Sequence, residues 1–322
     1  MTSVEGSRND AIRQALVNGV LTFLADQDRF ALQQIRDALA HEIDVAGPQA
    51  LLALKARVTT DAGWEYCEPD PLVRRIHRLL GRRFLRAGSR VIGAEFIARV
   101  AQQPVAIFAN HLSYADANVI EVLLERAGGA ELANRLTALA GPKVFTERQR
   151  RFSSLCFGTI KVPQSSEVSS GEAVLPPRDV ARASRQAIEV ARERLESGDA
   201  LLLFGEGTRS RTGAMQPMLP GVARYLAVPG TWILPVALTG PEELFPVGDP
   251  TLHPATVIMQ IGRPIRAQAL IDCAGRDRRL IVDAIGLAVA ELLPDQYRGV
   301  YGERDQFAEA ASVLLNATRR AQ

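Results

Sequence analysis

The sequence is poor in the residues that hold disulfide-rich and zinc-binding proteins together. Its 322 residues include three cysteines, Cys67, Cys156 and Cys273, and four scattered histidines. An odd and sparse set of cysteines argues against a disulfide framework and makes a reducing compartment the default expectation. No cysteines and histidines stand at the short spacings typical of zinc ligands, so we expect no metal.

The sequence also lacks a long apolar run. The longest uncharged stretch, Tyr225–Pro241, has 17 residues and is interrupted by Pro229, Gly230 and Pro235. A membrane-spanning helix needs about 20 mostly apolar residues, so none is expected. The first residues show no basic segment followed by an apolar one, which argues against a signal peptide. These absences predict a cytoplasmic protein, and peripheral contact with the inner face of a membrane is a separate question.

The sequence also lacks an excess of either charge, because 38 basic and 36 acidic residues leave a net charge of +2. We therefore expect no nucleic acid as a partner. The charge is nevertheless uneven along the chain. Residues 1–70 carry 6 basic and 11 acidic groups, residues 71–90 carry seven arginines and no acid, and residues 91–322 carry 25 of each. The hydrophobic fraction of 47% and charged fraction of 23% are ordinary for a globular protein and argue against disorder.

Helical periodicity dominates the first part of the chain. Apolar residues recur at helical spacing over residues 10–58, with a break at Gly47-Pro48, and residues 60–70 resemble a polar linker. We expect an N-terminal helical domain over residues 1–70. Residues 71–90 then form a basic amphipathic helix or linker. Its arginines either contact an anionic membrane surface or pair with the acidic first 70 residues.

The pattern changes from residue 104, where short apolar runs alternate with helical stretches. This alternation predicts an α/β domain over residues 91–322, with a mostly parallel or mixed central sheet flanked by helices. The expected strands are 104–109, 136–140, 158–162, 200–204, 232–238 and 256–261. The expected helices are 114–127, 145–155, 179–197, 220–228 and 281–293.

The first polar segment of chemical interest follows the strand 104–109. Ser113 and Asp116 fit a capping box at the start of a helix, which places His111 just before that helix. A histidine held by a carboxylate is a general-base arrangement, because the carboxylate sets the tautomer and stabilises the imidazolium. The alternative is that His111 merely satisfies a turn and Asp116 merely caps a helix.

A second polar loop follows the strand 200–204. Gly205 and Gly207 allow close backbone approach, and Arg209, Ser210 and Arg211 offer donors suited to phosphate. Ligands of open α/β sheets bind beyond the carboxyl ends of strands, where both polar segments are expected. The alternative is a solvated loop with surface arginines.

These residues resemble a known family. Asn110–Asp116 is similar to the first motif of the glycerolipid and lysophospholipid acyltransferases, and Phe204–Ser210 to their third motif, about 95 residues further on. Gly158–Val162 and Trp232–Ala237 are weaker matches to the second and fourth motifs. The resemblance covers roughly residues 90–265.

The resemblance implies an O-acyltransferase that moves a fatty acyl group from acyl-CoA or acyl-carrier protein to a hydroxyl group of a glycerol-phosphate lipid. The preferred acceptor is 1-acyl-glycerol-3-phosphate, which would give phosphatidic acid. His111 would be the general base and Asp116 would orient it. The acceptor site would comprise Lys161, Glu206, Gly207, Thr208, Arg209 and Ser210. No cofactor or metal is implied.

Two departures from the family pattern leave the acceptor open. Gln164 stands where the second motif usually ends in arginine, and Gly205 stands where the third motif usually has proline, which predicts a more flexible loop. Glycerol-3-phosphate and another lysolipid or hydroxylated lipid are alternative acceptors. A thioester hydrolase, or a non-catalytic protein of the same fold that binds lipid or acyl-carrier protein, are alternatives of other classes. Acyl-chain length, the role of residues 1–70 and the oligomeric state are not predicted.

Overall fold

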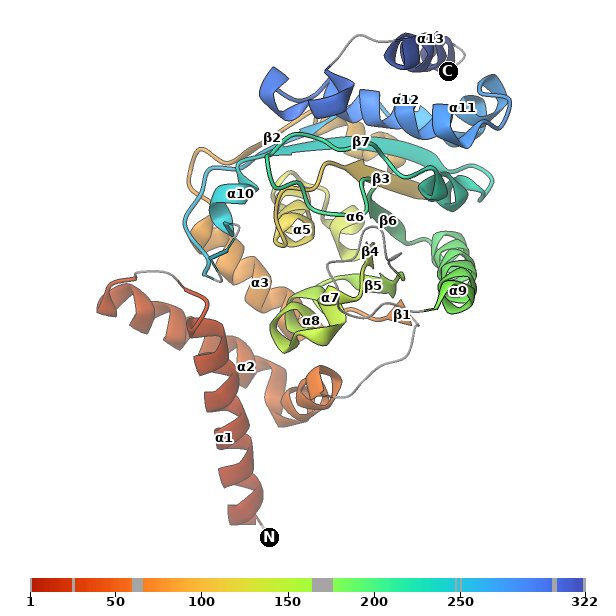
Figure 1. Ribbon diagram of the computed structural model, residues 1–322. Coiled ribbons are helices and arrows are strands. Elements are labelled where there is room, and N and C mark those ends of the chain that lie inside the picture. The colour runs from red at the N-terminus through yellow and green to blue at the C-terminus, as the bar shows by residue number, and fades with distance from the viewer. Residues whose placement is uncertain are drawn as a thin grey trace.

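The central element of the protein is one mixed β-sheet with helices on both faces (Figure 1). A computed structural model describes residues 2–24, 27–59, 66–163, 176–246, 248–249, 251–302 and 306–320. In these residues the sheet has nine strands in the order β1-β5-β4-β6-β3-β7-β8-β2, with β9 beside β7. The strands are β1 (Tyr66–Cys67), β2 (Arg90–Ile92), β3 (Val105–Ala109), β4 (Leu136–Ala140), β5 (Gly158–Lys161), β6 (Ala200–Phe204), β7 (Trp232–Thr239), β8 (Ile258–Ile261) and β9 (Ile265–Arg266).

The middle of the sheet is parallel, as expected for strands joined through helices. Strands β5, β4, β6, β3 and β7 pair in parallel, whereas β1 pairs antiparallel with β5, and β8 and β9 pair antiparallel with β7. Strand β2 pairs parallel with β8. All five residues of β3 are buried, because helices cover both faces. The predicted fold class, α/β with a mixed sheet and preceding N-terminal helices, is confirmed.

Helices from different parts of the chain cover the two faces. Helices α3 and α5 share one apolar core with the N-terminal helices, and α9, α12 and α13 share the other (Figure 1). No helix in the described part of the chain is long and apolar enough to cross a membrane. The helices are α1 (Thr2–Leu21), α2 (Arg29–Thr59), α3 (Pro71–Phe84), α4 (Glu95–Val100), α5 (Asp116–Arg126), α6 (Ala130–Asn134), α7 (Lys143–Thr146), α8 (Arg148–Ser154), α9 (Pro177–Glu196), α10 (Pro241–Leu244), α11 (Ala267–Cys273), α12 (Arg278–Ala290) and α13 (Gln306–Arg320), with 3₁₀ turns at Pro220–Leu226, Asp295–Tyr297 and Gly299–Tyr301.

The N-terminal segment differs from its prediction in two places. The break at Gly47-Pro48 is confirmed, because Gly47 has a φ of +81° that interrupts α2. A second break, between Leu21 and Arg29, was not predicted. The expected linker contains a strand, since Tyr66–Cys67 pairs antiparallel with β5, and residues 60–65 lie outside the described residues. The domain boundaries at 70 and 90 stay predictions.

Helix α3 is the predicted basic amphipathic helix, and its apolar face is packed inside the protein. Asp70 caps the helix by accepting hydrogen bonds from the backbone N–H groups of Leu72 and Val73 at 2.9 and 3.2 Å. The buried side chains of the helix are Leu72, Val73, Ile76, Leu80 and Phe84. Because this face is already covered, it is not available for insertion into a membrane interface.

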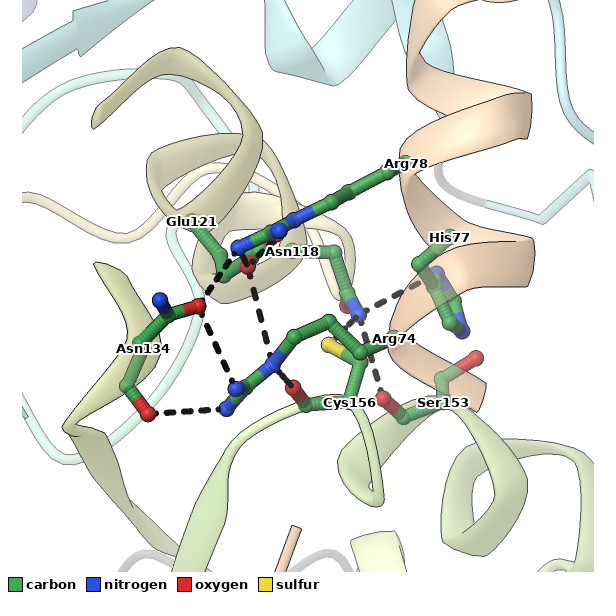
Figure 2. Close-up of polar contacts among 8 residues, drawn as sticks. All are labelled: Arg74, His77, Arg78, Asn118, Glu121, Asn134, Ser153 and Cys156. Carbon is green, nitrogen blue, oxygen red and sulfur yellow. Dashed lines mark hydrogen bonds and ion pairs between the residues drawn. The ribbon is translucent and has the colours of Figure 1, made fainter. Parts of the chain in front are cut away.

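Three arginines of α3 also contact protein partners, and Figure 2 shows Arg74 and Arg78 with theirs. Arg78 pairs with the buried Glu121 of α5 at 2.6 Å, and Arg74 donates to the carbonyl oxygen of Cys156 at 2.8 Å. Arg75 pairs with Glu42 of the acidic N-terminal segment at 2.9 Å. The exposed arginines of residues 71–90 are Arg82, Arg83, Arg86 and Arg90. Contact with an anionic membrane through residues 71–90 stays a prediction, and it now depends on these exposed arginines alone.

Candidate active site

The two polar loops singled out in the sequence lie side by side because β3 and β6 are neighbouring parallel strands. Ala109 and Phe204, the last residues of the two strands, are partners in the sheet register. The chain therefore leaves both strands at the same edge. The backbone N–H of His111 donates to Oε1 of Glu206 at 3.0 Å, and the N–H of Ser210 donates to the carbonyl oxygen of His111 at 2.8 Å.

His111 and Asp116 are directly hydrogen-bonded. Nδ1 of His111 lies 2.8 Å from Oδ2 of the fully buried Asp116. The same oxygen accepts from the N–H groups of Leu112 and Ser113 at 2.7 and 2.9 Å. With Asp116 as a carboxylate, this hydrogen bond requires the proton on Nδ1 and leaves Nε2 with its lone pair. The imidazole also stacks on Phe204, with ring centroids 4.2 Å apart.

The predicted capping box forms only in part. Helix α5 begins at Asp116 and its N-cap is Ala115, two residues later than the predicted cap at Ser113. The hydroxyl of Ser113 accepts from the N–H of Ala115 at 3.3 Å. The carboxylate half of the box does form, because Asp116 accepts from the N–H of Ser113. Asp116 thus stabilises the loop that carries His111 as well as the imidazole itself.

His111 lies on the wall of a cleft of about 940 Å³. Gly207, Thr208 and Arg209 of the second loop line the same cleft. Apolar side chains from α1, α3, α5 and the turn after α1 form another part of the wall, including Val20, Phe23, Leu24, Leu80, Phe84, Val119 and Val122. Its cationic residues are Lys143, Arg150, Arg209, Arg211 and Arg224. A histidine held by a carboxylate, several cations and an apolar wall in one cleft suit a substrate with an anionic head and a hydrocarbon chain.

Three predicted acceptor residues are buried behind the cleft and are not among its lining residues. Glu206 uses both oxygens on backbone N–H groups, those of His111 and Gln216. Ser210 donates its hydroxyl to the carbonyl oxygen of Ala214 at 2.8 Å. Lys161 is buried, with Nζ 4.4 Å from the centre of the Phe145 ring. These contacts favour a role in positioning for Glu206 and Ser210, whereas Lys161 contacts Phe145 and does not line the cleft.

The geometry of the second loop requires glycine at one position and leaves little room for a side chain at another. Gly207 has a φ of +71°, a conformation that L side chains rarely adopt, and a Cβ there would lie 2.5 Å from Cδ1 of Leu219. At Gly205 a Cβ would lie 2.6 Å from Sδ of Met218. Glycine in place of the family's proline therefore relieves a clash with Met218 at this position. The greater flexibility that we expected of the loop stays a prediction.

The buried carboxyl group of Glu206 predicts a pH-dependent stability. Burial raises its pKa from 4.5 to about 7, although the two backbone N–H groups favour the ionised form. The folded protein therefore holds this proton more tightly than the unfolded chain. Stability falls as pH rises from about 4.5 to about 7.

Compared with Glu206→Gln, the wild-type protein should lose roughly 3 kcal/mol of unfolding free energy across this interval, measured by urea denaturation at several pH values. Glu95→Gln, an exposed position on α4, is the control for removal of a surface charge. A difference between wild type and Glu206→Gln that does not change with pH would contradict the prediction.

Several residues of the cleft were missed in the sequence. Arg150 belongs to a charged stretch that shows no pattern, and Tyr114 lies inside the first motif without an assigned role. Outside the lining of the cleft, the sequence indicated no carboxylate partner for His253, and this is wrong, because Nε2 of His253 lies 2.7 Å from Oδ2 of Asp249. The spacing of four residues was the available signal for that pair. Gln164, which leaves the acceptor open, lies outside the described residues.

Comparison with known proteins identifies the class. The family model named Acyltransferase matches residues 88–239, a span that contains both polar loops. The match agrees with the resemblance found in the sequence, and the expected enzyme class, an O-acyltransferase, is confirmed.

Comparisons with individual proteins show less similarity to this chain. No curated protein matches the chain in sequence. Among solved structures, the 1-acyl-sn-glycerophosphate (LPA) acyltransferase PlsC from Thermotoga maritima is similar to it, with 19% identity and a TM-score of 0.48. The match covers 79% of this chain and 91% of that one.

Proposed function

We propose that this acyltransferase moves a fatty acyl group from a thioester, acyl-CoA or acyl-carrier protein, to a hydroxyl group of a glycerol-phosphate lipid in phospholipid synthesis. The preferred acceptor is 1-acyl-glycerol-3-phosphate, and the product is phosphatidic acid. The observation that carries the proposal is that the hydrogen-bonded His111–Asp116 pair, the cation of Arg209 and an apolar wall share one cleft. Each part matches one chemical feature of such a substrate: hydroxyl, phosphate and acyl chain.

The reaction needs one base and good positioning. Nε2 of His111 takes the proton of the acceptor hydroxyl while its oxygen attacks the thioester carbonyl carbon. The new C–O bond forms, the C–S bond breaks, and the thiolate leaves with the bonding electrons. The thiolate then accepts the proton that the imidazolium carries. Asp116 stabilises the imidazolium while it exists. No metal or cofactor enters this scheme, because a thiolate is a good leaving group and alignment of the two substrates lowers the barrier further.

Product identification tests the proposal. The purified protein is incubated, in buffer containing a chelator, with acyl-CoA or acyl-carrier protein and with matched acceptors, and the products are identified by mass spectrometry. The acceptors are 1-acyl-glycerol-3-phosphate, glycerol-3-phosphate, a lysolipid with a larger head group and 1-acylglycerol. We expect phosphatidic acid to form fastest.

The other outcomes are equally informative. Faster acylation of glycerol-3-phosphate or of another lysolipid would replace the preferred acceptor. Free fatty acid released at the same rate without any acceptor would instead indicate a thioester hydrolase. Binding of lipid without turnover of any thioester would indicate the non-catalytic alternative.

A further inference from the structure

Two arginines from separate parts of the chain lie over the same aromatic ring beside the general base. The guanidinium carbon of Arg150, on α8, lies 3.9 Å from the centre of the Tyr114 ring, and that of Arg209 lies 4.3 Å from it. Tyr114 belongs to the loop between His111 and Asp116. Both arginines and Tyr114 line the cleft. The ring thus holds two cations next to the catalytic loop through cation–π contacts.

The charges of these two arginines are poorly compensated by the protein. Arg150 pairs through Nε with Glu147 at 3.0 Å, but the Glu147 side chain is 49% exposed, so this ion pair is weak. Nη1 of Arg150 is buried without a hydrogen-bond partner. Within the described residues, the side chain of Arg209 has no ion pair or hydrogen bond. Two neighbouring cations in a partly desolvated cleft repel each other, and a bound anion would relieve that repulsion.

The separation of the two arginines suits a single phosphate group. Because both lie close to one ring centre, their guanidinium carbons are at most about 8 Å apart. A phosphate group that touches both guanidinium groups can accept charge-assisted hydrogen bonds from each. Lys161, the other cation that we expected at the acceptor, is buried over Phe145 and does not line the cleft.

We propose that Arg150 and Arg209 together bind a phosphate monoester, with Tyr114 as the platform that holds them, and that this phosphate belongs to the acceptor lipid. The inference rests on the proposed function, since it assigns the head-group site of the same reaction. It adds Arg150 as a residue that determines specificity for acceptors with a phosphate. The thioester donor is the other source of a phosphate, and the experiment distinguishes the two.

Steady-state kinetics with Arg150→Gln test the assignment. Initial rates are measured against 1-acyl-glycerol-3-phosphate, against the matched 1-acylglycerol, and against the thioester donor. We expect the KM for the phosphate acceptor to rise at least tenfold, with kcat changed less and the donor KM unchanged. Turnover of 1-acylglycerol should be unaffected. Arg148→Gln, an exposed arginine on the same helix, is the matched control and should behave as wild type.

Other patterns overturn the proposal. A raised donor KM with an unchanged acceptor KM would move the site to the donor, and an equal loss with both acceptors would indicate a structural role. Tyr114→Phe and Tyr114→Leu provide a second test if Arg150→Gln is unstable. The phenylalanine variant keeps the ring and should retain the acceptor KM, whereas the leucine variant should raise it. Equal values for these two variants would contradict the role of the ring.

A binding measurement separates this inference from the proposed function. Calorimetric titration with sn-glycerol 3-phosphate, and with glycerol as the uncharged control, does not depend on turnover. If the wild-type protein acylates no glycerolipid but binds glycerol 3-phosphate at least tenfold more tightly than Arg150→Gln does, the proposed function fails and the phosphate site stands. If phosphatidic acid forms but the two proteins bind glycerol 3-phosphate equally, the phosphate site fails and the proposed function stands.

Discussion

His111→Ala is expected to lower kcat by about 10²–10⁴-fold while the protein stays folded. The imidazole is the base that the proposed reaction needs, and its Nδ1 is already hydrogen-bonded to Asp116. Without it, the acceptor hydroxyl must lose its proton to water. The measurement is the initial rate of acyl transfer at saturating donor and acceptor, with thermal unfolding as the test of folding.

The exposed His41 offers a matched control for the removal of an imidazole. His41→Ala should keep wild-type turnover. The His111 side chain is 17% exposed and stacks on Phe204, so its removal costs some packing. His111→Asn, which retains a polar side chain, guards against a variant that loses activity through unfolding. Wild-type turnover by a folded His111→Ala protein would refute the assignment of the base.

Asp116→Asn should reduce kcat by roughly 10²-fold or more and leave both KM values near those of the wild type. The amide has nearly the shape of the carboxylate, so its oxygen can still accept hydrogen bonds from the loop. It lacks the negative charge that stabilises the imidazolium. Asp116→Ala is a less informative variant, because it would also leave the buried N–H groups of Leu112 and Ser113 without their acceptor.

Ser113→Ala is the control for a change in the same loop. Among the described residues, the Ser113 hydroxyl makes only long hydrogen bonds, at 3.3 Å from the N–H of Ala115 and 3.4 Å to the carbonyl oxygen of Phe245. Its loss should change turnover by no more than a few fold. If Asp116→Asn and Ser113→Ala showed the same kcat, the carboxylate charge would have no part in the reaction.

The sheet could be predicted where its strands are long and buried. The expected strands 136–140 and 200–204 coincide with β4 and β6, because strands covered on both faces are short continuous apolar runs between polar turns. Strands β1, β2 and β9 have two or three residues each, too few to show a period. They form only because a neighbouring strand offers free backbone groups, which is a property of the folded sheet.

For helix α3, the sequence predicted the element but not the residues that it packs against. Its apolar period and its start at Pro71 were evident in the sequence. The partners of its arginines were not, because Glu121 lies 43 residues beyond Arg78 (Figure 2). Two alternatives, a membrane surface and the acidic N-terminal segment, were equally consistent with the charge pattern. Only the folded structure shows that the apolar face is buried against the protein.

In the candidate site, too, some contacts could be predicted from the sequence and others could not. His111 and Asp116 are five residues apart, so their hydrogen bond is local. The spacing suggested the pair but left open that Asp116 merely caps a helix, and the family resemblance favoured the pair. The position of Glu206 behind His111 depends on the adjacency of β3 and β6, which no local pattern encodes. Arg150 reaches the cleft through the packing of α8 on the loop of Tyr114. Chemistry that depends on neighbours in the chain was therefore predictable, whereas the roles of Glu206 and Arg150 come from contacts that only the folded sheet and its helices create.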